Sequence, residues 1–318
     1  MADFILDFEK PIRVIQDKIE ALEAQPPAEE TQRELDRLIA KRKAELKKVY
    51  SNLTRWQHVQ LARHPQRPYS LDYIRYLAPN FVELHGDRYY ADDTALVGGL
   101  GTVEEEVILF IGQQKGRNTK ENLYRNFGMM RPEGYRKALR LMKLAEKFQR
   151  PVVCLIDTPG AYPGIGAEER GQGEAIARNL REMARVKIPV LAIVIGEGAS
   201  GGALGIGICD RLLMLENTWY SVISPEGCAS ILWRDATKAP EAADAMQVTP
   251  DDLLRMGICD RIIPEPLGGA HYQPEAMKAT LKKVILEELK PLKKIPPDTF
   301  LQRRIKRYDR MGVYEEQP

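Results

Sequence analysis

An uncharged apolar segment that runs directly into a glycine-rich stretch constrains this chain more than any other feature. Residues 190–195 (VLAIVI) are largely β-branched, which predicts a strand buried on both faces. Six of the next twelve residues, 196–207, are glycines, and those from Gly201 onward are small. We therefore expect a strand, a tight turn and a short helix. The first amides of such a helix lack intrahelical acceptors and can stabilise an oxyanion, although the glycines would also permit close strand–helix packing.

Strand-like and helix-like segments alternate on both sides of this stretch. Residues 95–100 and 107–111 are expected to pair as strands around a turn. Residues 151–156 read as another buried strand, followed by a turn-rich segment and a helix that reaches about residue 186. Strand–strand–helix units of roughly 40 residues thus recur without sequence identity. The pattern predicts the α/β class.

Helices are expected at both ends of the chain. In the first helix, apolar residues recur at helical spacing and form a narrow seam of coiled-coil type: Ile12, Ile15, Ile19 and Leu22. If exposed, such a seam would mark an interface. A second helix begins near Thr31, and the basic, amphipathic tail after Pro296 predicts a terminal helix. We divide the chain into an N-terminal helical arm (1–27), a main domain (28–296) and a C-terminal helical tail (297–318).

The bulk properties exclude several classes of protein. A net charge of +2, from 47 basic and 45 acidic residues, gives no global field that would point to nucleic acid. No run of 18 apolar residues and no signal-peptide pattern follows Met1, so we expect a cytoplasmic protein with no membrane association. The cysteines lie far apart in apolar settings without a Cys-x-x-Cys pair, which predicts reduced thiols and no metal site: Cys154, Cys209, Cys228 and Cys259.

The glycine-rich stretch also matches two common motifs, and both matches are weak. Residues 196–201 fit G-x-G-x-x-G, with Glu216 at the position of a dinucleotide fold's ribose-binding acid, but the following helix is too short. Residues 198–202 fit G-x-S-x-G, with Asp260 and His271 in the chain order of an α/β-hydrolase. Nothing in the sequence brings His271 back to Ser200, so a hydrolase or thioesterase remains only the enzyme alternative.

Six blocks of the sequence carry a resemblance: residues 6–9, 126–129 with 132–140, 157–164 with 167–172, 196–198 with 200–204, 220–227 and 265–271. Together they resemble the alpha subunits of bacterial acetyl-coenzyme A carboxylase carboxyltransferase. The resemblance covers nearly the whole chain and is far more specific than either motif. One departure is Ala199, where the family pattern has glycine, and another is the unaligned linker around Pro26.

This resemblance implies a crotonase-like spiral of ββα units, with residues 28–296 as the carboxyltransferase domain. It implies transfer of a carboxyl group from carboxybiotin, on the biotin carboxyl carrier protein, to acetyl-CoA. The product would be malonyl-CoA, in the first committed step of fatty acid biosynthesis. The partners would be a zinc-ribbon beta subunit, in an alpha2–beta2 heterotetramer, and biotin carboxylase, which uses the ATP. No cofactor would be bound covalently here, and zinc would lie only in the beta subunit.

The resemblance also assigns roles to individual residues. Gly201 and Gly202 match the family's oxyanion-hole pair for biotin, and valine at Gly202 is expected to stop transfer while sparing the fold. Gly160 and Ala161 occupy the equivalent strand-to-helix junction and would shape the opposite wall. Arg170 could clamp a substrate carboxylate or pair with Glu168 or Glu169.

Other roles remain open. Lys115 and Arg117 could meet the CoA phosphates or simply be surface residues. No general base is evident, so biotin itself could take the proton. A non-catalytic scaffold, with its active half in a partner, is the alternative from another class.

Overall fold

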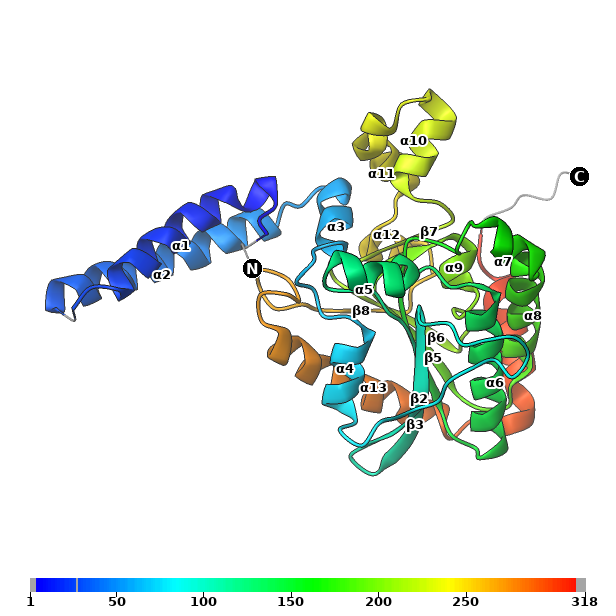
Figure 1. Cartoon of the computed structure of the whole chain (residues 1–318). Coiled ribbons are helices and arrows are strands. Elements are labelled where there is room, and N and C mark those ends of the chain that lie inside the picture. Colours follow the sequence, from blue (N-terminus) through cyan, green and yellow to red (C-terminus); the bar gives the residue numbers. More distant parts are fainter. Residues whose placement is uncertain (1–3, 27, 313–318) are drawn as a thin grey trace, which may run out of the picture.

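The computed structural model describes residues 4–26 and 28–312 and centres on one eight-stranded sheet (Figure 1). The strand order is β1-β2-β3-β4-β5-β6-β8, and β7 pairs with the far end of β5. β1, β2 and β3 are antiparallel, whereas all pairings from β3 onward are parallel. The strands are β1 (Val82–Glu83), β2 (Leu96–Val103), β3 (Glu106–Gln113), β4 (Val152–Thr158), β5 (Val190–Ala199), β6 (Arg211–Leu215), β7 (Trp219–Ser221) and β8 (Arg261–Ile263).

Helices cover both faces of this sheet, which explains why β4 and β5 are buried throughout. On β5, Val190, Ala192 and Val194 face one core, which contains residues of α6 (Pro132–Lys147) and α8 (Gln172–Arg185). The alternate β5 residues face a second core with α4 (Ser70–Leu77) and α13 (Pro274–Leu292): Leu191, Ile193 and Ile195. The expected α/β class is thereby confirmed, as is the predicted pairing of residues 95–100 with 107–111, which lie in β2 and β3.

The N-terminal arm is a hairpin of α1 (Lys10–Glu23) and α2 (Glu29–Tyr50) that projects from the body (Figure 1). Ile15 and Ile19 are 7% and 2% exposed and pack with Leu38 of α2. The seam is therefore covered within this hairpin and does not form the exposed stripe that would indicate an interface. The boundary proposed at residue 27 falls between these two helices, and the domain division stays a prediction.

Shorter helices complete the fold, and α10 with α11 stands away from the sheet (Figure 1). The expected terminal helix is α14 (Phe300–Asp309). No helix in the described ranges has the length and apolar character that a membrane crossing requires. The other helices are α3 (Arg55–Ala62), α5 (Thr119–Tyr124), α7 (Ile165–Glu169), α9 (Ser200–Leu204), α10 (Pro225–Trp233), α11 (Ala239–Met246) and α12 (Pro250–Arg255), with 3-10 turns at Asp7–Glu9, Asn126–Gly128, Ala236–Lys238 and Pro297–Thr299.

Candidate active site

The glycine-rich stretch forms the strand, turn and short helix that its sequence predicts. β5 ends at Ala199, and α9 follows at once with Ser200 exposed and in the left-handed region at a φ of 58°. Ala199 caps the helix without a side-chain acceptor, so its first amides have no capping partner there. Gly201 is partly exposed, whereas Gly202 is buried. The two glycines thus differ in how accessible they are to a ligand.

Gly202 packs against the backbone of the loop that follows β4. A Cβ atom on Gly202 would lie 2.3 Å from the carbonyl carbon of Gly160 and 2.6 Å from the nitrogen of Ala161. The structure therefore brings together two of the sequence-predicted sites. It also corrects the expectation that valine at Gly202 spares the fold, because this backbone contact leaves no room for a side chain.

Gly201 is the glycine with free space beside it. A Cβ atom there would meet only Ile176, at an ordinary 3.4 Å from its Cδ1 atom. Close packing, the alternative reading of these glycines, therefore explains Gly202 but does not explain Gly201.

A buried glutamine links the two loops through hydrogen bonds. The Gln113 side chain, at the end of β3, donates from Nε2 to the Gly202 carbonyl at 2.7 Å. Its Oε1 accepts from the amide of Asp157 at 3.1 Å, on the strand that leads to Gly160. Because both ends of one amide group are used, Gln113 couples the position of α9 to the loop after β4.

A mainly apolar pocket of about 520 Å³ opens beside Gly201. Ser200 and Gly201, at the start of α9, line it together with apolar side chains. A lining of this kind suits a neutral ring system bearing a polar oxygen. The larger side chains in its wall are Leu204, Tyr220, Val222, Met246, Leu253, Met256 and Ile258.

A chain of charged side chains meets the glycine-rich stretch at Glu197. Lys115 Nζ is 2.7 Å from both Asp157 Oδ1 and Glu197 Oε1, and Glu197 also accepts from Arg63 Nε at 2.6 Å. Arg63 continues the chain to Glu226. Burial alone would lower the pKa of Lys115, but the two carboxylates outweigh it and raise that pKa.

Neither basic residue considered for the CoA phosphates is free in this structure. Lys115 is held in the buried chain of charges. Arg117 donates to the carbonyls of Pro65 and Arg67 at 2.9 and 2.8 Å and stacks over Tyr69. Both residues therefore hold the fold together. Sequence reasoning missed this role because their partners are distant in the chain.

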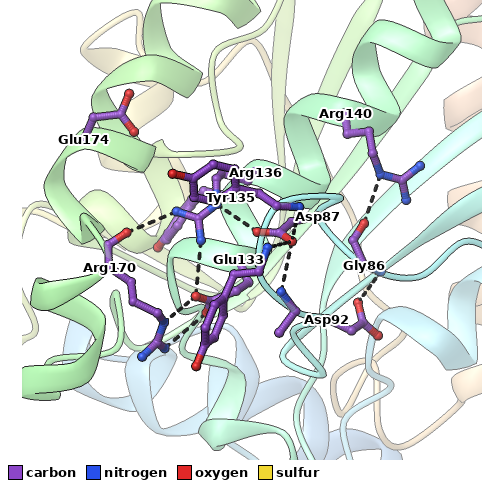
Figure 2. A network of polar contacts seen from close by, with 12 residues as sticks. Gly86, Asp87, Asp92, Glu133, Tyr135, Arg136, Arg140, Arg170 and Glu174 are labelled. Carbon is purple, nitrogen blue, oxygen red and sulfur yellow. Dashed lines mark hydrogen bonds and ion pairs between the residues drawn. The ribbon is translucent and has the colours of Figure 1, made fainter.

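Arg170 lies in a separate polar network between α6 and the start of α8 (Figure 2). Its Nε and Nη2 atoms donate to the two carboxylate oxygens of Glu133 at 2.5 and 3.3 Å, and its guanidinium lies over Tyr90. Its partner is therefore Glu133, and the expected pairing with Glu168 or Glu169 was wrong. Its own carbonyl accepts from Arg136. A substrate-binding role for Arg170 stays a prediction.

Comparison with known proteins matches residues 5–312 to the family model described as acetyl co-enzyme A carboxylase carboxyltransferase-like. The chain belongs to this family. Two relatives named acetyl-coenzyme A carboxylase carboxyl transferase subunit alpha support the assignment, each with 98% of both chains covered. The protein of Chlorobium limicola is 56% identical, and that of Xanthomonas axonopodis pv. citri is 58% identical.

Solved structures place this carboxyltransferase-like chain in the crotonase-like fold that the resemblance implied. A Pseudomonas malonate decarboxylase hetero-tetramer in complex with coenzyme A aligns with a TM-score of 0.59 and 18% identity, over 75% of this chain and 92% of that one. Transcarboxylase 12S, with methylmalonyl-coenzyme A bound, aligns with a TM-score of 0.56 and 17% identity, over 79% of this chain and 44% of that one. At such identities these structures support the fold alone.

The hydrolase and dinucleotide interpretations of this carboxyltransferase-like chain fail on geometry as well. His271 stacks on His64 with ring centroids 3.8 Å apart, and Asp260 pairs with Arg307. Neither belongs to the pocket beside Ser200. Glu216 accepts from the amide of Glu265, and α9 has only five residues, too few for a dinucleotide-binding helix.

One group of side chains in the described ranges has the composition of a metal site, and it lies where the arm meets the body. The ligand atoms of Glu9, His64 and His271 lie within 4.8 Å of one another. The two imidazole planes are inclined by only 21°, so their lone pairs lie in nearly parallel planes and do not converge. This geometry does not favour a metal, and the absence of a metal from the site beside Gly201 stays a prediction.

Proposed function

We propose that this chain is the carboxyltransferase component that moves a carboxyl group from carboxybiotin, on a carrier protein, to acetyl-CoA. The family membership and the names of the relatives support this reaction. The geometric support is the pocket beside Gly201, where the uncapped start of α9 adjoins apolar side chains. The bicyclic ring of biotin, with its ureido oxygen, is a group of that kind.

The amides at Gly201 and Gly202 would act as the oxyanion hole. The N–CO₂ bond of carboxybiotin breaks, and negative charge develops on the ureido oxygen. Loss of one such preorganised donor costs about 3–4 kcal/mol of transition-state stabilisation. Gly160 and Ala161 would form the opposite wall, because Gly202 rests against them.

The second half of the reaction forms the product. The ureido nitrogen takes a proton from the methyl group of acetyl-CoA, and the resulting carbanion attacks the released carboxyl carbon to give malonyl-CoA. Among the residues that the structure describes, no acidic or basic side chain lines the pocket beside Gly201, which is consistent with the substrate acting as base. Arg170 would have to exchange Glu133 for a substrate carboxylate in order to bind it.

A partner subunit would complete the site. Large apolar side chains around the pocket and on the neighbouring α10 are exposed: Val222 by 82%, Ile231 by 72% and Leu232 by 64%. Exposed apolar surface of this kind marks protein contacts. The proposed partners are a zinc-ribbon beta subunit, in an alpha2–beta2 assembly, the biotin carrier protein and biotin carboxylase. No covalent cofactor is proposed here, and zinc is assigned to the beta subunit.

The remaining proposals concern place and layout. We assign the protein to the cytoplasm. We keep an arm at 1–27, a carboxyltransferase domain at 28–296 and a tail at 297–318. The scaffold alternative differs from the proposal in one respect, because a scaffold would tolerate bulky substitution at Gly201.

Copurification followed by an activity assay tests this function. The chain is isolated from its source cells with its bound subunits and supplied with malonyl-CoA and a biotin analogue. Formation of acetyl-CoA that depends on the biotin analogue is the expected result. Release of free CoA from acetyl-CoA without biotin would instead indicate a thioesterase.

A further inference from the structure

A second cavity, of about 410 Å³, lies beside the C-terminal helix α14 and is strongly cationic. Two carboxylates also line it, those of Asp210 and Asp260. Cations therefore outnumber acids in its wall, although the whole chain has a net charge of only +2. The cationic side chains in the wall are Arg211, Arg303, Arg304, Lys306, Arg307 and Arg310.

Two of these arginines form a fixed floor and use up both carboxylates. Arg304 is 1% exposed and donates to Asp210 at 2.9 and 2.7 Å as well as to nearby carbonyls. Arg307 donates to Asp260 at 2.7 Å and to the Ile258 carbonyl at 3.0 Å. Because these contacts fix α14, the remaining cations project from a rigid support.

In the part of the chain that the structure describes, three further cations on α14 and at its C-cap form no ion pairs. Arg303, Lys306 and Arg310 are exposed, and each is three or four residues from the next, which puts them on one helix face. Across residues 4–26 and 28–312, none of the three forms an ion pair. The Nε atom of Arg307 is buried and also lacks an acceptor. The cavity thus holds several hydrogen-bond donors for which the described chain supplies no anion.

The cationic cavity adjoins the pocket beside Gly201. Gly257 lines the cationic cavity, while its neighbours Met256 and Ile258 line the other pocket. Tyr308 of α14 accepts from the Cys209 amide at 2.9 Å, just beyond the glycine-rich stretch. One short segment therefore separates the two cavities, and a long ligand or two separate ligands can occupy them together.

We propose that the cationic cavity binds the phosphate groups of a phosphorylated ligand. Arginine donors match phosphate oxygens in paired geometry, and a cationic recess concentrates such anions. Two sources share this chemistry: the 3′-phospho-ADP end of the CoA thioester, and a free nucleotide such as ADP. The first source rests on the proposed function, whereas the second does not.

Calorimetric titration of the full chain with CoA and with ADP tests the proposal. The variant R303E/R310E alters only exposed side chains, and K290E/K294E makes the same change of charge at exposed positions outside the cavity. Wild type and control are expected to bind, with an affinity that falls as salt rises, and R303E/R310E should bind at least about tenfold more weakly. Equal affinity in all three proteins, or binding of neither probe to wild type, would overturn the proposal. Tighter binding of CoA than of ADP identifies the thioester as the ligand, and the reverse order identifies a nucleotide.

A transfer assay on the copurified complex separates this inference from the proposed function. If CoA is the ligand, R303E/R310E raises KM for acetyl-CoA with kcat unchanged and leaves turnover of acetyl-pantetheine, which has no phosphates, unaltered. Equal loss with both substrates would show damage at the reaction centre and would count against a phosphate site. A wild-type complex without any transfer activity would refute the proposed function, while the titrations would still decide the cavity.

Discussion

Gly202 touches the backbone of Gly160, so that a Cβ atom on Gly202 would lie only 2.3 Å from the Gly160 carbonyl carbon. Two loops that are distant in the chain, one after β4 and one after β5, are thereby fixed against each other beside the pocket. The same contact makes the two adjacent glycines experimentally separable, because a side chain at Gly201 would meet the Ile176 side chain at van der Waals distance, whereas one at Gly202 would meet backbone.

The first prediction compares valine at these two positions. Gly202→Val should destabilise the protein by more than the usual overpacking cost of about 1–3 kcal/mol, since the obstacle is backbone and cannot rotate away. Gly201→Val should keep the fold but reduce transfer by about 100-fold, because its methyl groups would crowd the start of α9, which lines the pocket and carries the proposed oxyanion amides. Urea unfolding and steady-state rates of the complex are the measurements. A stable, active Gly201→Val variant would support the scaffold alternative.

The second prediction concerns Ser200, which occupies the nucleophile position of the G-x-S-x-G match. No histidine lines the pocket beside it, so the hydroxyl has no base to activate it. Ser200→Ala should therefore retain most transfer activity, and a fluorophosphonate probe should not label the wild-type protein there. Covalent labelling at Ser200, detected by mass spectrometry, would contradict this prediction.

The third prediction concerns Lys115, which sits between two buried carboxylates. Lys115→Met would leave Asp157 and Glu197 facing each other without their shared cation. Breaking a buried ion pair by removing one partner typically costs about 3–5 kcal/mol. Lys120→Met, at an exposed position of the following helix, is the control and should be nearly neutral. Chemical denaturation of both variants checks the difference, and similar midpoints would mean that Lys115 is not structurally required.

These sites also show what the sequence could and could not predict. β5 and its glycine-rich turn were predictable because burial on both faces leaves a local, uninterrupted apolar signature. The bonding partner of Arg170 was not, because Glu133 lies 37 residues away on another helix. The contact of Gly202 with Gly160 likewise arises only when β4 and β5 pair. The local periodicity of apolar residues predicts which face of a helix or strand is buried. It does not predict which residue, distant in the chain, packs against that face.

The fourth prediction is a loss of stability in acid through His64, at the junction of arm and body. Burial lowers the pKa of His64 to about 4, and the neighbouring His271 acts in the same direction. Below about pH 6.5 this histidine becomes protonated in the unfolded chain but stays neutral in the folded one. The free energy of unfolding therefore falls toward pH 4 by up to about 1.4 kcal/mol per pH unit.

Variants at two histidines isolate this effect. In His64→Gln that part of the pH dependence should disappear. In His85→Gln it should persist, because the His85 side chain is 62% exposed and remote from Glu9 and Tyr50, the other groups at the junction. Urea unfolding at pH 7, 6 and 5 measures the difference. Identical pH profiles for wild type and His64→Gln would refute the assignment.

The last prediction is that the isolated chain does not catalyse transfer. The pocket beside Gly201 offers one set of amides, whereas the reaction develops charge on two oxygens, that of biotin and that of the thioester. The exposed side chains of Val222, Ile231 and Leu232 supply the apolar surface that a second subunit would cover. Purified chain with malonyl-CoA and a biotin analogue should be inactive and should gain activity when the zinc-ribbon subunit is added. The shared-site proposal assigns the missing donors to the partner, so turnover by the isolated chain at the rate of the mixture would refute it.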